Sequence, residues 1–272
     1  MLRVGKHGFE LVPGARVDLP DDLRHQWNAR VDELLDGLEP AELKAVELAA
    51  VLGHNVRGEI WSAARKRTGA ELTEKLRMRL QQLSVARPLD DGDDWRFEHP
   101  MFREEITVRA RKSRRLHRLH LACAKAMEDV DRGAAHLAEQ RGRHLLMAGE
   151  PLAAAHVLLE AASAQIEEHQ FEEATRILAL RDETLRRLDL PADSPRPAES
   201  EVLRCRIMRL SGQDADAAAL ATKLTRLEDH AGCHEVIARA LGELFEMKMA
   251  DGRYKEGREA PSAGRAQGPE HH

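Results

Sequence analysis

The chain has 272 residues, of which 42% are hydrophobic, 33% charged and only 3% aromatic, so leucine and alanine must build most of its core. This length accommodates two modest domains. The net charge of −5 argues against binding of bulk nucleic acid by the chain as a whole.

The sequence carries no export or membrane signal. No apolar run approaches the roughly 20 residues that a membrane helix needs, and the first residues lack the apolar stretch of a signal peptide. The three cysteines, Cys123, Cys205 and Cys233, are widely spaced and belong to no disulfide or metal motif. We therefore expect a soluble, cytoplasmic protein with reduced thiols and no membrane partner.

Residues 1–22 form a turn-rich lead-in, and helical periodicity begins after them. Apolar side chains recur at helical spacing from Leu23 to Leu38, which predicts one amphipathic helix. Pro40 suits the first turn of a second helix, which should end at Gly53.

Two further helices, over about residues 57–67 and 71–84, precede a β-hairpin signal. Short extended segments at Val85–Leu89 and Trp95–Phe97 flank the acidic turn Asp90–Asp94. Helices followed by such a hairpin predict a winged-helix domain over residues 23–108. Its expected core consists of Trp61, Leu76, Leu80, Leu83, Trp95 and Phe97.

Residues 109–257 show helical periodicity throughout, so the fold class is predicted to be mainly α: a small winged helix followed by an array of α-hairpins. Breaks are expected near Gly149–Pro151, His169–Gln170, Leu190–Pro197, Gly212 and Gly232. Residues 258–272 lack an apolar stripe and should form a disordered tail.

Three segments of the array are similar to the turn between the helices of a tetratricopeptide repeat: His169–Ala174, Gln213–Ala218 and Gly252–Gly257. Each combines a tight turn with a small residue where two helices approach. They begin 44 (169 to 213) and 39 (213 to 252) residues apart. Both spacings exceed the ~34 residues of the consensus, so the repeats are expected to be irregular. The first unit departs from the consensus residue types at Gln165, Leu178 and Arg181.

The third of these units is cut short, because a Pro/Gly-rich tail follows Gly257 where a second helix is needed. A solenoid without a polar capping helix exposes apolar surface. We therefore expect the chain to be a fragment of a longer protein or the product of a truncated reading frame.

The strongest charge feature is a basic run between residues 109 and 118. On one continuous helix, Arg111, Arg114 and Arg118 would form a stripe opposite Leu116 and Leu119. Such a stripe is a candidate binding surface for an acidic partner or a nucleic-acid backbone. A solvated helix face explains the same pattern and is favoured, since the chain is acidic overall.

Histidines near this run invite a metal interpretation. His117, His120 and Cys123 share part of one helix, but His120 and Cys123 lie on or beside its apolar face, so packed side chains are favoured and no metal site is predicted. His99-Pro100 is expected to cap or orient the helix that follows the hairpin.

A winged helix also raises the possibility of DNA binding through its recognition helix, which is predicted at residues 71–84. The exposed arc of residues 71–84 offers Glu74, Arg77, Met78 and Gln81, in which one acid offsets one base. The turn Asp90–Asp94 would place four carboxylates against phosphates, which disfavours this hypothesis.

The sequence contains no complete enzyme motif. Gly5-Lys6 lacks the glycine spacing of a phosphate-binding loop and precedes His7 instead of Ser or Thr. His117-Arg118-Leu119 has no following Asp of the kinase type, and no Asp-Phe-Gly occurs. We predict no catalytic residues and no enzymatic activity for this chain.

Several segments together resemble the C-terminal half of bacterial STAND-type ATPases (signal-transduction ATPases with numerous domains), especially those fused to a serine/threonine protein kinase. The resemblance covers about residues 9–230. The segments that carry it are Leu19–Leu23 with Trp27, Leu48–Gly53, Trp95–Glu104, Arg115 and His117 through Cys123-Ala124, and Ala138–Glu150.

In that family, a nucleotide-binding domain precedes the winged helix, and helical repeats sense a ligand or a partner protein. The resemblance implies that residues 1–22 are the remnant of a missing nucleotide-binding domain. ATP would bind to missing domains, and no cofactor would bind to this chain. A histidine corresponding to His99 contacts bound nucleotide in some relatives, so His99 is a candidate nucleotide contact.

We therefore predict a non-catalytic regulatory and protein-interaction segment of a signalling protein. Its partners would be a protein bound by the concave face of the array, the upstream kinase and ATPase domains, and an acidic partner at Arg111, Arg114 and Arg118. The alternative is a winged-helix DNA-binding transcriptional regulator.

Overall fold

The computed structural model describes residues 2–5, 8–11, 21–89, 92–130, 135–191, 194–227 and 233–259. The fold is mainly α, as predicted, with small antiparallel sheets. The chain divides into two compact units, which are treated separately below. Unit 1 comprises Met1–Val130 with Met147–Gly149, and unit 2 comprises Asp131–Leu146 with Glu150–His272.

The N-terminal part of unit 1 contains a hairpin and a helix. Strands β1 (Leu2–Gly5) and β2 (Gly8–Leu11) pair antiparallel with Leu2 opposite Leu11. Helix α1 (Asp21–Leu35) begins two residues before the predicted start of the domain. The lead-in between β2 and α1 lies outside the described residues.

The next elements follow the order of a winged helix. They are α2 (Pro40–Leu52), β3 (Asn55–Val56), α3 (Gly58–Thr68), α4 (Glu74–Gln82), β4 (Ala86–Pro88) and β5 (Trp95–Phe97). The three strands form one antiparallel sheet in the order β3-β5-β4, which confirms the predicted hairpin. Strand β3 was not predicted, because two residues are too few to show an alternating pattern.

Local interactions set the starts of two of these helices. Pro40 occupies the first turn of α2, and the Glu42 carboxylate accepts the backbone N–H of Glu39 at 3.0 Å. The hydroxyl of Thr73 donates to the same carboxylate and accepts the N–H of Leu76 at 3.1 Å, which caps α4. One buried carboxylate thus joins the beginnings of α2 and α4.

The predicted core of the winged helix is confirmed except at one position. Trp61 and Trp95 meet edge to face with ring centroids 5.4 Å apart, and Phe97 is fully buried. Leu83 is only half-buried, because α4 ends at Gln82 and Leu83 serves as its C-cap.

Two more helices complete unit 1, α5 (Pro100–Lys112) and α6 (Leu116–Val130). Helix α6 packs on α2 and α3, and its residues Leu119, Cys123 and Met127 are buried. The predicted boundary at residues 108/109 falls inside α5, whereas this unit continues to Val130. The apolar face of α6 explains the difference, since it completes the core of the winged helix.

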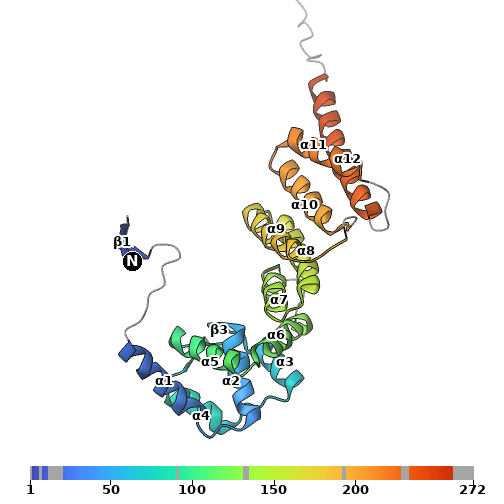
Figure 1. The fold of residues 1–272 in the computed structure, drawn as a ribbon. Coiled ribbons are helices and arrows are strands. Elements are labelled where there is room, and N and C mark those ends of the chain that lie inside the picture. Colours follow the sequence, from blue (N-terminus) through green and yellow to red (C-terminus); the bar gives the residue numbers. More distant parts are fainter. Residues whose placement is uncertain are drawn as a thin grey trace, which may run out of the picture. The chain divides into compact units, whose positions relative to one another are not determined.

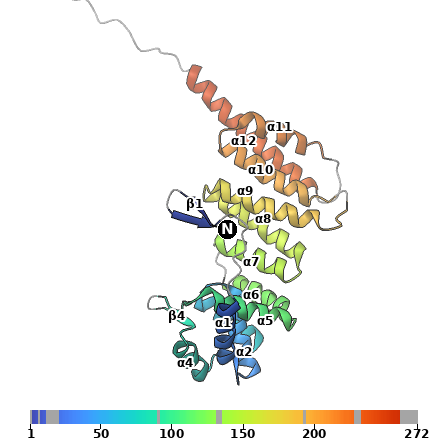
Figure 2. The ribbon, with the colours of Figure 1, turned by 60° about the vertical axis from the view of Figure 1, so that its left-hand side comes forward.

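Unit 2 consists of helices that follow one another along the chain (Figures 1 and 2). They are α7 (Ala135–Met147), α8 (Pro151–Glu167), α9 (Phe171–Arg186), α10 (Arg196–Leu210), α11 (Asp214–Leu224) and α12 (Cys233–Glu259). The predicted breaks before α8, α9, α10 and α11 are confirmed. The predicted break at Gly232 lies outside the described residues.

The third predicted turn is wrong. Helix α12 continues through Gly252–Gly257 as far as Glu259. A Cβ added at Gly252 would meet no atom within 4 Å, so nothing packs closely against this glycine in the described part of the chain. Glycine lowers helix propensity by about 1 kcal/mol. This cost alone does not end a helix when no tertiary contact favours a turn. The predicted tail from residue 260 onward is not among the described residues.

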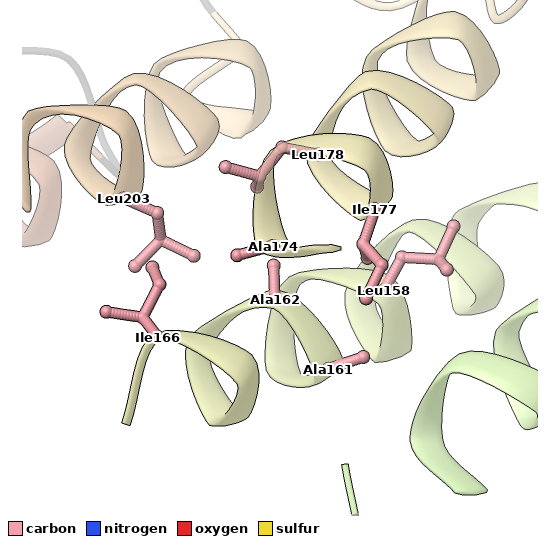
Figure 3. Packing of buried hydrophobic residues seen from close by; sticks show 8 residues of the cluster. All are labelled: Leu158, Ala161, Ala162, Ile166, Ala174, Ile177, Leu178 and Leu203. Atoms are coloured by element: carbon pink, nitrogen blue, oxygen red, sulfur yellow. The ribbon is translucent and has the colours of Figure 1, made fainter. Parts of the chain in front are cut away.

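The α8–α9 hairpin has the densest core of unit 2 (Figure 3). Its buried cluster consists of Leu158, Ala161, Ala162, Ile166, Ala174, Ile177 and Leu178, with Leu203 of α10. Alanines at the contact let the two helices approach closely. Helix α7 also comes close, since a Cβ added at Gly142 would lie 2.8 Å from the Leu158 side chain.

The departure from repeat consensus at Arg181 has a structural explanation. The Arg181 side chain is buried, and it donates to the carbonyl oxygens of Ala155 at 2.9 Å and Arg196 at 2.7 Å. It also donates to Ser200 at 2.6 Å and pairs with Glu199. A buried guanidinium therefore joins α8, α9 and α10 where the consensus has a small residue.

Replacing Leu158 with alanine should destabilise unit 2 by about 2–5 kcal/mol, because the cavity left in the α8–α9 core cannot close. Leu152→Ala on the same helix is the matched control. Leu152 is 46% exposed, so its loss should change stability by no more than about 0.5 kcal/mol. Urea denaturation followed by circular dichroism measures both; equal effects would contradict the described packing.

Candidate functional site

His99 is the N-cap of α5. Its Nδ1 accepts the backbone N–H of Met101 at 3.3 Å, and Pro100 occupies the first helical position. The predicted capping role is therefore confirmed. The residue itself is exposed at the surface of unit 1.

Aromatic and basic side chains from α1 fix the orientation of the His99 ring. Trp27 stacks on it with ring centroids 4.2 Å apart and meets Phe102 edge to face at 5.1 Å. The Arg30 guanidinium lies 5.2 Å from the Trp27 ring and donates to the carbonyl of Leu83 at 2.9 Å. Because Nδ1 accepts, a neutral His99 carries its proton on Nε2, which donates to no group among the described residues.

The predicted stripe of arginines does not lie on one helix. Arg111 is at the end of α5, Arg114 lies in the turn with φ of 56°, and Arg118 is on α6. The helix ends at Lys112, so the spacing that would align the three side chains is interrupted. All three remain exposed, but the structure assigns them no shared face.

Two other members of the basic run form ion pairs within unit 1. Arg109 contacts Asp32 at 2.5 Å and Glu105 at 2.9 Å. Arg115 donates through Nη2 to Glu47 Oε1 at 2.6 Å and through Nε to both carboxylate oxygens at 3.0–3.1 Å. Glu47 is 2% exposed, so this pair supplies a buried carboxylate with its counterion. Glu47 was not singled out from the sequence.

Two of the three candidate metal residues on α6, His120 and Cys123, are packed side chains, and His117 is exposed. The Cys123 thiol is fully buried 3.9 Å from the carbonyl of Leu48, and burial raises its pKa well above the ordinary value. His120 is 9% exposed, and burial, followed by Arg111, Arg103 and His117, lowers its pKa to about 4. Within the described ranges no three His, Cys, Asp or Glu side chains are grouped to hold a metal ion.

Sequence reasoning missed a cavity of about 240 Å³ in the winged helix. It lies between α3, α4 and the β4–β5 hairpin, and its lining includes Trp61, Arg65, Arg77, Gln81, Asp93 and Trp95. The buried Nε atoms of Arg65 and Trp95 find no acceptor among the described residues. Trp61 and Trp95 were assigned to a closed core, and no sequence pattern marks a gap beside them.

Helix α12 exposes an apolar stripe. Leu241, Phe245 and Met249 recur every four residues and are 52%, 61% and 44% exposed. They lie opposite Val236 and Ala240, which are buried against unit 2. None of the helices in the described ranges is both long and apolar enough to cross a bilayer.

We compared the chain with protein-family models, curated proteins and solved structures, and none of the three comparisons found a match. The resemblance to STAND-type ATPases therefore stays a prediction carried by the residues quoted above.

The depressed pKa of His120 predicts a pH-dependent stability of unit 1. Between an unfolded pKa of 6.5 and a folded pKa of about 4, the unfolded state binds a proton that the folded state excludes. The free energy of unfolding of unit 1 should have its full value above pH 6.5 and should fall as the pH drops toward 4. His120→Gln should flatten this loss between pH 7 and pH 5 in urea titrations. His156→Gln, which removes an exposed histidine of α8, should not; an unchanged loss in His120→Gln would contradict the assignment.

Proposed function

We propose that the chain is a non-catalytic regulatory and protein-interaction segment of a bacterial signalling protein of the STAND ATPase/serine-threonine kinase type. Two features support this proposal: a winged helix precedes helical hairpins along the chain, and His99 stands at the start of α5, the helix that follows the wing. The same order of elements is implied by the family resemblance.

The observation that carries the proposal is the geometry of His99. Its Nδ1 is engaged by the helix cap, and Trp27 holds the ring by stacking. The Nε2–H is thereby directed by two independent contacts and remains able to donate to an external acceptor. A phosphate of a nucleotide in an adjoining domain is an acceptor of this kind. Nucleotide state would then bias the position of the winged helix, and partner binding would bias the same equilibrium.

In this proposal the hairpins of unit 2 bind a protein partner. Helical repeats commonly present such surfaces, and the buried Arg181 network holds α8, α9 and α10 together as one body. Arg111, Arg114 and Arg118 are retained as an exposed basic surface for an acidic partner, as separate side chains and not as a stripe. The chain would work in the cytoplasm, without a cofactor of its own.

The coding sequence upstream of the Met1 codon provides a direct test. A phosphate-binding loop and kinase motifs in the same reading frame would support the proposal. An upstream frame that encodes neither domain would contradict it.

In a protein that includes this upstream domain, His99→Asn should weaken retention of ADP about tenfold, because one charge-assisted hydrogen bond to phosphate is lost. Asparagine also caps helices, so α5 and the stability of unit 1 should be preserved. His99→Ala is the companion variant, which should lose both the cap and the nucleotide contact. Equilibrium dialysis with labelled ADP measures retention, and wild-type retention in His99→Asn would show that His99 only caps α5.

The DNA-binding alternative predicts a different result. On α4, Arg77 lies 3.5 Å from Glu74, and Asp94 of the wing is held internally by the N–H of Gly58 at 2.8 Å. Asp93 stands exposed on the same wing. This mixed surface offers little attraction for phosphates.

We therefore expect no saturable binding of labelled duplex DNA at 50 mM salt by fluorescence anisotropy, and no change on Arg77→Glu. Binding that falls steeply by 200 mM salt and is lost in Arg77→Glu would support the regulator instead. Capture of a protein partner that survives nuclease treatment would favour the signalling segment.

A further inference from the structure

The cavity in the winged helix combines positive charge with an aromatic wall. Arg65 of α3 and Arg77 of α4 both line it, together with Trp61 and Trp95. Nothing in the proposed function uses these four side chains, so the following inference is independent of it.

The two guanidinium groups are incompletely neutralised. Arg65 forms no ion pair with the described residues, and Arg77 pairs within them only with Glu74, 3.5 Å away and largely exposed, although Asp93 and Asp94 line the same cavity. Both guanidinium groups line the same cavity, and burial, followed by repulsion from Arg77, lowers the pKa of Arg65. An anion between them would relieve this repulsion.

Hydrogen-bond donors at the cavity also lack acceptors. The indole N–H of Trp95, a residue only 8% exposed, and the Nε–H of Arg65 are both buried without a partner in the described structure. Trp61 differs, because its indole N–H donates to the carbonyl of Ala45 at 2.9 Å. Buried donors are nearly always paired in folded proteins, so two unpaired donors on residues that line one cavity are unusual.

The two described acids of the wing, Asp93 and Asp94, do not pair with these donors. Asp94 accepts the N–H of Gly58, and Asp93 is exposed at the rim. A Cβ added at Gly58 would lie 2.5 Å from the Cβ of Asp93, so the wing is packed closely on the start of α3. Close packing between the start of α3 and the wing therefore forms the cavity wall on this side.

The remaining surface of the cavity suits a flat apolar group. Trp61 and Trp95 meet edge to face with centroids 5.4 Å apart, and the Arg65 guanidinium lies 4.7 Å from the centre of the Trp61 ring. Leu80 and Pro88 complete the apolar part of the lining. A volume of about 240 Å³ limits the occupant to a small molecule.

We propose that this cavity is a binding site for a small organic carboxylate. The carboxylate would accept from the guanidinium groups of Arg65 and Arg77, and the apolar body would lie against the two indole rings. Occupancy would join α3, α4 and the wing through one ligand, the elements that a winged helix uses for contact with other molecules.

Benzoate is a suitable probe, and the indole N–H signals of the three tryptophans give the readout in two-dimensional ¹H–¹⁵N NMR. Titration of the whole chain should shift the Trp95 signal saturably, with a Kd of about 1 mM or below. Trp27 does not line the cavity and is the internal control. Tryptophan-to-phenylalanine variants assign the signals.

Two matched comparisons test the carboxylate and its partners. Neutral benzamide should bind at least about tenfold more weakly than benzoate, because it lacks the charge. Arg65→Met keeps an apolar stem on Trp61 and should weaken benzoate by a similar factor, as should Arg77→Met. Arg87→Met makes the same charge change on β4 outside the cavity and should leave the Kd within about twofold.

Three results would overturn the proposal: equal binding of benzamide and benzoate, a Trp95 signal that does not move, or equal effects of Arg65→Met and Arg87→Met. Inorganic phosphate binding as tightly as benzoate would also overturn it, since the aromatic wall would then contribute nothing. The spectra of each variant report folding, so a variant that fails to fold is replaced by Arg65→Gln or Arg77→Gln.

Discussion

The ion pair between Glu47 and Arg115 determines how unit 1 is built. A carboxylate that is 2% exposed on α2 must find a counterion, because an unpaired buried charge costs several kcal/mol. The guanidinium comes from the residue just before α6, and its three contacts fix where the chain turns after α5. Helix α6 is thereby laid along α2 and α3, so the winged helix is completed by residues far beyond its wing.

A buried charge organises unit 2 in the same manner. Arg181 is 1% exposed and distributes its donors over two carbonyl oxygens, a hydroxyl and a carboxylate. Because these acceptors lie on α8 and α10, the arginine links three helices by hydrogen bonds. A small residue at this position would provide close packing without such bonds. The irregular spacing of the repeats fits this difference, since the α9–α10 junction is built around a side chain and not around close backbone contact.

The candidate site was only partly predictable. His99 was identified as a cap from its position before Pro100, which is a local property. The arginine stripe failed, because its alignment depended on one continuous helix, and Arg114 adopts a left-handed conformation that ends the regular spacing. The cavity beside Trp61 and Trp95 left no sequence signal, since apolar periodicity is the same for a filled core and for one with a gap.

The sequence by itself determined the helices, most of their ends, the wing hairpin and the presence of two domains. These features depend on periodicity and on proline, glycine and capping residues that lie close together in the chain. Only the tertiary structure decided which charged side chains are buried and which arginines form ion pairs within the chain. It also decided that Gly252 lies within a helix and that two donors at one cavity lack acceptors. Those properties arise from contacts between segments far apart in sequence, where the pairing of a side chain depends on what packs against it.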